Sequence, residues 1–196
     1  AVDADLFSST NLTGDLWIRS DGNFAAYSWL TTLGTNGGTD TIPAMQSFWI
    51  RVQDGTTGSI GMDNSTRIAG NHDFFKSDKK YAKAIKLALS NGKLTDETAI
   101  GFFKEAKNGF DIFDTEKMFA KTDEYPQLFS QTGGYALAVN ALEKDKTDRS
   151  IPLSLVIPEN GFYSIKTMEL PANENMDIFL ADLEQDIIIY LMKNKE

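Results

Sequence analysis

The fold is decided by Ala106-Lys107-Asn108-Gly109-Phe110-Asp111-Ile112-Phe113-Asp114-Thr115-Glu116-Lys117 and by the two runs that flank this segment. Both runs, Thr98–Lys104 before it and Tyr135–Asn140 after it, have the apolar and β-branched content that is typical of strands. The segment itself holds an Asn-Gly pair, which is typical of tight turns, and a loop rich in carboxylates. It brings together no nucleophile and base. We therefore expect a rigid β-rich module that is not an enzyme.

Strand-like runs recur along the whole chain, separated by Gly, Asn and Asp at positions that favour turns. The other predicted strands are Asp15–Arg19, Phe24–Trp29, Met45–Gln53, Tyr81–Leu89, Ile151–Val156, Phe162–Met168, Met176–Ala181 and Ile187–Met192. Many short strands with frequent turns predict an all-β fold, an antiparallel sandwich of two sheets that is jelly-roll-like.

Two segments between these runs are predicted not to be strands. Asp114–Phe119 is predicted to form a short helical turn, with Asp114 as its N-cap and Lys117 in its last turn. The segment Thr31–Thr41 is rich in Gly and Thr and is predicted to be a long loop. No Pro-rich or Ser-rich linker divides the chain, so we expect residues 1–196 to form a single module.

Composition excludes several classes of protein. The chain has 196 residues, 19 Lys plus Arg against 28 Asp plus Glu, and a formal net charge of −9. A surface of that sign repels phosphate backbones, so we expect no nucleic-acid partner. The cysteine count is zero, which excludes disulfides and thiolate metal sites. The longest apolar runs, such as Ile187–Ile189, are too short for a membrane span, so no membrane insertion is expected.

Carboxylates supply the candidate metal ligands. Asp111 and Asp114 are three residues apart in a turn, where they could converge on calcium or act as an acid/base pair on a glycoside. The alternative, which we favour, is that they stabilise the turn by accepting hydrogen bonds from backbone amides or by pairing with Lys117. Asp3 with Asp5, and Asp21 with Asn23, are weaker calcium candidates. No other cofactor is expected.

Aromatic residues supply the candidate ligand-binding site. Trp17, Tyr27 and Trp29 lie in two early predicted strands. By alternation, Trp17 points away from the face of its neighbours Leu16 and Ile18, while Tyr27 and Trp29 share a face. An exposed platform of such rings would stack on a polysaccharide. The alternative is that the rings fill the core, where aromatic side chains bury large areas.

Histidine chemistry finds no support in the sequence. His72 is the single histidine, so a cluster of histidine ligands is excluded, and no Gly-x-Ser-x-Gly elbow is present for a catalytic triad. We expect His72 to be a loop or surface residue.

Several blocks, taken in order, resemble one family: β-sandwich modules near the C-terminal end of large proteins exported by the type IX secretion system. The blocks are Ile42–Val52, Asp96–Phe102, Asn108–Asp111, Phe113–Lys117, Pro126–Ser130, Leu137–Leu142, Ile151–Leu153 and Gly161–Ile165. Asp111, Asp114 and Lys117 match the family's motif, and the family offers no catalytic residues to carry over.

The resemblance also sets expectations about context. Family members have an Asn-Pro-Tyr-Pro-Ser segment before the residues that correspond to Ala1–Asp3, and a C-terminal sorting domain follows; this sequence has neither. We therefore expect a fragment of a longer exported protein that reaches the export machinery through a separate C-terminal domain.

The expected function follows from that context. The resemblance implies a non-catalytic module, extracellular or at the cell surface, with a role in adhesion, display or spacing. Its expected partners are a polysaccharide or another surface protein. The alternative is a carbohydrate-binding module that serves an attached enzyme.

Overall fold

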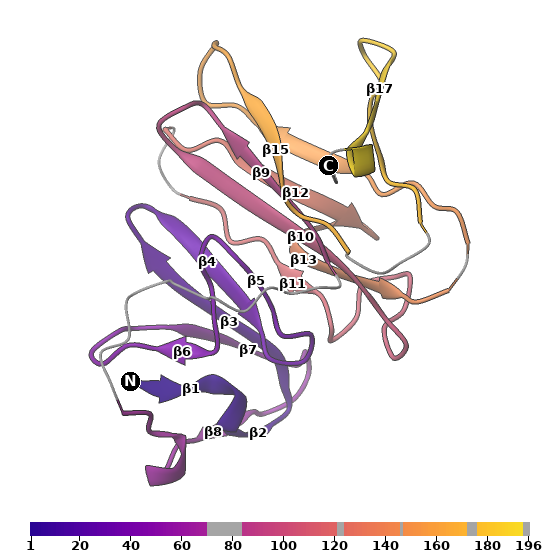
Figure 1. Cartoon of the computed structure of the whole chain (residues 1–196). Coiled ribbons are helices and arrows are strands. Elements are labelled where there is room, and N and C mark those ends of the chain that lie inside the picture. Colours follow the sequence, from indigo (N-terminus) through magenta and orange to yellow (C-terminus); the bar gives the residue numbers. More distant parts are fainter. Residues whose placement is uncertain (70–83, 121–123, 146, 172–175, 194–196) are drawn as a thin grey trace.

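The computed structural model describes residues 1–69, 84–120, 124–145, 147–171 and 176–193. In these residues it is built from strands, with three short 3₁₀ turns and no α-helix (Figure 1). The all-β class is therefore confirmed. No helix within these ranges is long and apolar enough to cross a membrane.

The N-terminal part of the chain forms a four-stranded sheet and two small two-stranded pairings (Figure 1). The four-stranded sheet has the order β5-β4-β3-β7, and the pairs are β1-β6 and β2-β8. The bounds are β1 Val2–Asp3, β2 Ser8–Thr10, β3 Leu12–Ser20, β4 Asn23–Ser28, β5 Leu33–Thr35, β6 Thr41–Ile42, β7 Trp49–Val52 and β8 Ser59–Gly61. Two 3₁₀ turns accompany them, η1 Ala4–Leu6 and η2 Asn64–Thr66.

The rest of the chain forms a seven-stranded, curled sheet and a C-terminal hairpin. The sheet has the order β14-β12-β13-β10-β9-β15, with β11 paired to β13, and the hairpin is β16-β17. The bounds are β9 Ala84–Ser90, β10 Thr95–Phe103, β11 Thr115–Glu116, β12 Gln127–Thr132, β13 Tyr135–Glu143, β14 Leu153–Val156, β15 Ser164–Glu169, β16 Phe179–Asp182 and β17 Ile187–Tyr190, followed by the 3₁₀ turn η3 Leu191–Lys193.

One pairing departs from the antiparallel pattern. The strands β10 and β13 are parallel, with Ala99 opposite Val139 and Phe103 opposite Glu143. Parallel neighbours need a crossover connection, which is usually a helix. In the described residues of this crossover there is no α-helix, and it holds the strands β11 and β12. The Asn108-Gly109 pair therefore lies in a crossover loop and is not the turn of a hairpin.

The helical turn predicted over Asp114–Phe119 is wrong. Thr115 and Glu116 form strand β11, which pairs antiparallel with β13. The Lys117 amide continues this pairing by donating to the Ala136 carbonyl at 2.8 Å. The Asp114 carboxylate does accept a nearby amide, that of Asp111 at 2.9 Å, but this bond closes a loop and caps no helix.

The two larger sheets pack against each other. On one side of this interface, Trp17 and Phe24 lie against Ala138 of β13. Farther along, Leu33 of β5 packs with Ala99 and Val139. The long loop predicted over Thr31–Thr41 is thus wrong in part, because it contains a strand whose Leu33 side chain fills the core.

Both sheets are also covered on the face turned away from this interface. Leu16, Ile18 and Tyr27 of the smaller sheet pack with Ala4 and Ile42 from the N-terminal segments. The curled sheet buries a second apolar cluster that the C-terminal segments cover; its buried members are Ile85, Leu87, Leu89, Ile100, Leu128, Leu142 and Ile178. Burial on both faces explains why β3 and β4 have almost no exposed positions.

A buried carboxylate, Asp96, holds the two sheets together. Its oxygens accept from the Lys117 ammonium at 2.6 and 2.5 Å and from the Leu128 amide at 2.6 Å. On the smaller sheet's side they accept from the side-chain amides of Asn23 and Asn36, at 3.0 and 2.8 Å. We call these five residues the Asp96 centre. The side chains of the ion pair, Lys117 and Asp96, are 2% and 0% exposed.

A reciprocal pair of hydrogen bonds lies next to the Asp96 centre. The Asn36 amide donates to the Glu97 carboxylate at 2.6 Å, and the Glu97 amide donates to the Asn36 side-chain oxygen at 2.9 Å. Lys86 adds a cation 3.5 Å from the same carboxylate. Asn36 follows β5 and Glu97 lies in β10, so these bonds join the two sheets a second time.

We predict that Lys117→Met lowers the free energy of unfolding by about 3–5 kcal/mol, because it leaves the Asp96 carboxylate buried without its cation. Urea-induced unfolding followed by tryptophan fluorescence measures the loss. Lys166→Met on the exposed strand β15 is the control, with an expected change within about 0.5 kcal/mol. A loss of less than about 1 kcal/mol for Lys117→Met would contradict the role given to the ion pair.

Candidate functional site

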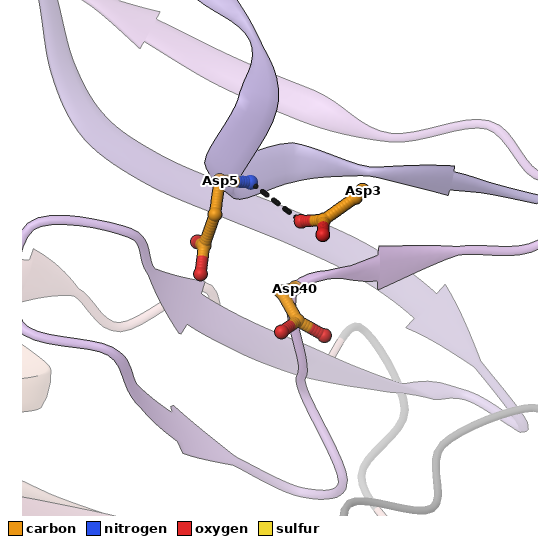
Figure 2. A group of neighbouring side chains, drawn as sticks. All are labelled: Asp3, Asp5 and Asp40. Atoms are coloured by element: carbon orange, nitrogen blue, oxygen red, sulfur yellow. Dashed lines mark hydrogen bonds between the residues drawn. The ribbon is translucent and has the colours of Figure 1, made fainter. Parts of the chain in front are cut away.

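Three carboxylates near the N-terminus form the one acidic cluster with metal-ligand spacing in the described part of the chain (Figure 2). Asp3, Asp5 and Asp40 each offer an oxygen, and these oxygens lie within 4.8 Å of one another. The pairing of β1 with β6 brings the segments together, since Asp3 stands opposite Thr41. Oxygen ligands at this spacing suit a hard cation such as calcium.

The same carboxylates also have hydrogen-bond partners within the protein. The Asp5 amide donates to Asp3 at 3.0 Å, the bond drawn in Figure 2. The buried Tyr27 hydroxyl donates to Asp5 at 2.9 Å, and the Thr41 hydroxyl donates to Asp40 at 3.1 Å. These bonds account for the position of the cluster without an ion. The sequence pointed to Asp3 and Asp5 as a pair, but it gave no sign that Asp40 joins them.

The carboxylates of the candidate calcium pair, Asp111 and Asp114, both accept hydrogen bonds from backbone amides. Asp111 accepts from the amides of Lys107 and Phe113, both at 2.8 Å. Asp114 is buried and accepts from the amides of Asp111 and Ala141, at 2.9 and 2.8 Å. Three of the four carboxylate oxygens thus accept amides within the crossover loop, and the fourth, on Asp114, accepts the Ala141 amide of β13. This arrangement matches the alternative that the two residues stabilise a turn, although Lys117 pairs with Asp96 instead of with either of them.

The other weak pair, Asp21 and Asn23, is also separated. Asp21 lies in the turn between β3 and β4 and has a positive φ of 49°. Asn23 is buried and points to Asp96, to which it donates at 3.0 Å. The two residues therefore lie in a turn and in the core, respectively. His72 lies outside the described residues.

The structure places the rings of the candidate aromatic platform in the core, in line with the alternative that they fill it. Trp17 is 4% exposed and Tyr27 is 1% exposed, while Trp29 is half-buried against the Leu16 and Ile18 cluster. The faces that alternation predicted are nevertheless correct: Trp17 faces the curled sheet, and Tyr27 and Trp29 face the N-terminal segments. The rings therefore lie on opposite faces of one sheet and cannot stack together on a sugar.

A second buried carboxylate, Asp15, joins β3 to β11. It accepts from the Thr115 hydroxyl at 2.6 Å and from the Thr13 hydroxyl at 2.7 Å. Beside it, the Trp17 indole donates to the Glu116 carbonyl at 3.0 Å, and Arg51 pairs with the Glu116 carboxylate. The two-residue strand β11 is thus fixed to the smaller sheet through both of its residues.

Burial changes the protonation of these groups. Loss of solvent raises the pKa of Asp15 to about 7, against the opposing effect of its two threonine hydroxyls and of Arg51. Burial likewise raises the pKa of Asp114 to about 7, despite two amide donors. The pKa of Lys117 is lowered because burial disfavours its ammonium, and the Asp96 carboxylate counteracts that shift.

The residues that join the sheets gave little signal in the sequence. Thr13, Thr115, Asn23 and Asn36 are ordinary strand or turn residues, and nothing in their spacing indicates that they meet. One feature of the sequence does indicate buried carboxylates: Asp15 lies in a predicted strand, and Asp96 lies beside one. A carboxylate within a run that becomes buried needs donors, and the fold has to supply them.

We predict that the free energy of unfolding decreases as the pH rises from about 4 to about 7. Folded Asp15 and Asp114 keep their protons over this window, while the same groups in the unfolded chain have released them, because an exposed aspartate there has its ordinary pKa of 3.8. Each group contributes a slope of about 1.4 kcal/mol per pH unit between its two pKa values. Urea unfolding at about pH 4.5, 6 and 7.5 measures how the free energy of unfolding depends on pH.

Two variants separate the contribution of Asp15 from general effects of pH. Asp15→Asn cannot lose a proton and should flatten the pH profile, whereas the exposed Asp148→Asn should leave the profile as in the wild type. Identical slopes for Asp15→Asn and the wild type would contradict the assignment.

We predict that Asp114→Ala lowers the free energy of unfolding by about 1–3 kcal/mol, because the Ala141 amide is left buried without its acceptor. Asp111→Ala, which removes the acceptor of the exposed Lys107 amide and of the Phe113 amide, should cost less. Urea unfolding measures both. A calcium-dependent rise in melting temperature that disappears in either variant would instead assign a metal to this loop.

Comparison with known proteins gives one match. A family model described as a domain of unknown function, DUF8693, matches residues 15–195. No curated protein and no solved structure matches the chain. Because the family match covers most of the chain, it reaches from β3 to the end of the C-terminal hairpin and includes both larger sheets. The chain therefore belongs to the DUF8693 family of domains of unknown function.

Proposed function

We propose that this chain is a non-catalytic module of a cell-surface or secreted protein, in which it spaces, displays or adheres. The observation that carries the proposal is the Asp96 centre, which uses a buried ion pair and three further donors to join the two sheets. Buried charges cost free energy unless they are paired, and here their geometry supports the rigidity of the fold.

The other ionisable groups that the sequence offered for chemistry have the same kind of role. Asp15 joins the two sheets, and Asp111 and Asp114 hold the crossover loop. A general acid or nucleophile must face the position of a substrate, whereas these carboxylates face threonine hydroxyls and backbone amides. This use of charge is what a passive, rigid module needs.

The location is proposed from the resemblance to modules of proteins exported by the type IX secretion system. In this proposal a separate C-terminal domain provides access to the export machinery, and the partner is a polysaccharide or another surface protein. The alternative is a carbohydrate-binding module; of the rings it would use, Trp17 and Tyr27 are buried and Trp29 is half-buried, which favours the first proposal.

The location can be tested on cells that make the parent protein. An antibody raised against the folded chain should label intact cells or detect the protein in the medium, and protease added outside the cells should remove the label. An antibody against a cytoplasmic protein is the control. Detection only after cell lysis would overturn the proposed location.

The non-catalytic character needs a separate assay. The purified chain should release no chromophore from a panel of nitrophenyl glycosides and esters beyond the rate of buffer alone. Turnover that is lost in Asp114→Asn or Asp15→Asn, while both variants stay folded, would overturn the proposal and identify the acid.

A further inference from the structure

The C-terminal hairpin β16-β17 exposes apolar side chains on both of its faces. Ile187, Ile188 and Ile189 are 49%, 70% and 52% exposed, and Leu183 at the turn is 92% exposed. Successive residues of a strand point to opposite faces, so neither face of β17 is covered. Figure 1 shows the hairpin projecting from the curled sheet. Runs of this kind are typical of strands that lie inside a sheet and are buried on both sides.

The hairpin also has an open hydrogen-bonding edge. Within the described ranges, β17 pairs only with β16, from Ile187 opposite Asp182 to Tyr190 opposite Phe179. Alternate amide and carbonyl groups of β17 therefore face away from β16. A two-stranded hairpin alone is only marginally stable in water, and it gains stability when a third strand or a packed layer is added.

Both edge strands of the curled sheet, β14 and β15, have features that hinder pairing, whereas β17 has none. Strand β15 carries Lys166 and Glu169 and has a register irregularity between Thr167 and Glu169. Strand β14 follows Pro152. Charges, prolines and bulges are the usual means of blocking an edge. The four residues of β17, Ile187–Tyr190, contain none of these.

Charge indicates which kind of strand fits this edge. The turn of the hairpin carries Asp182, Glu184 and Asp186 within five residues, and Asp177 lies at its base. The whole chain has a net charge of −9, so a second copy would bring another acidic turn and an acidic body. A strand with Lys or Arg beside its apolar residues would satisfy both the apolar faces and the acidic turn.

We propose that β17 accepts an added β-strand: an extended peptide segment with apolar residues and flanking basic residues, which continues the β16-β17 hairpin at its open edge. Main-chain hydrogen bonds would supply the pairing, and the isoleucine side chains would supply the apolar contacts. The inference is independent of the proposed location, because it rests on the hairpin alone.

The test uses a labelled synthetic peptide, Lys-Val-Thr-Val-Thr-Val-Lys, and the full chain. Fluorescence anisotropy should show saturable binding, and hydrogen exchange of the Ile187–Tyr190 amides should slow at least tenfold when the peptide is saturating. A peptide with proline at the central valine cannot pair and should not bind. A peptide with glutamate in place of both lysines should bind at least threefold more weakly.

Variants locate the binding to β17. Ile188→Lys should weaken binding at least tenfold. Because Ile188 is 70% exposed, the variant should keep the melting temperature of the wild type. Phe162→Lys, at a fully exposed aromatic residue outside the hairpin, is the matched control and should bind as the wild type does. If Ile188→Lys does alter the melting temperature, hydrogen exchange of the wild-type β17 amides with and without peptide decides whether the peptide binds at β17.

Three results would overturn the proposal. The first is no amide protection on β17 at saturating peptide, and the second is equal binding of the proline peptide. The third is a dimer in light scattering whose β17 amides are already protected without peptide, which would assign the edge to a second copy of the chain.

Discussion

The structure depends on one buried carboxylate, that of Asp96, at the start of strand β10. Five hydrogen bonds reach it from four other residues, and they join the beginning of β4, the loop after β5, the end of β11 and the beginning of β12. Each donor would be costly to bury without its acceptor, and the acceptor would be costly to bury without Lys117. The cluster therefore specifies how the sheets meet, because other arrangements leave these groups unpaired.

The short strand β11 extends that constraint along the interface. Thr115 reaches Asp15, Glu116 receives the indole of Trp17 and the guanidinium of Arg51, and Lys117 reaches Asp96. Thr115 and Glu116 thus contact the smaller sheet, and Lys117 contacts β10 of the curled sheet. The crossover that contains β11 is in turn held against β13 by Asp114. The loop that appeared most suited to chemistry in the sequence is a structural connection between the two sheets.

The sequence predicted the class of fold and the faces of individual strands, because both follow from alternation. Trp17 opposite to Leu16, and Tyr27 with Trp29, were assigned correctly. Prediction from the sequence failed where contacts between residues far apart in the chain decide the local structure or the neighbours of a side chain. The segment after Asp114 has helix-compatible residues, yet pairing with β13 makes it a strand. Asp40 joins Asp3 and Asp5 only through the pairing of β1 with β6, and Tyr27 is covered by N-terminal segments that a two-sheet expectation did not include.

Native-state hydrogen exchange can establish whether the Asp96 centre makes the two sheets one cooperative unit. The amides of Leu16, Ile18 and Ala26 in the smaller sheet and those of Leu87, Ile100 and Val139 in the curled sheet would be followed at increasing urea concentration. We expect both sets to exchange through one opening, with the same free energy and the same dependence on urea. If the smaller sheet opened separately, with a lower free energy than the curled sheet, the Asp96 centre would not unite the fold.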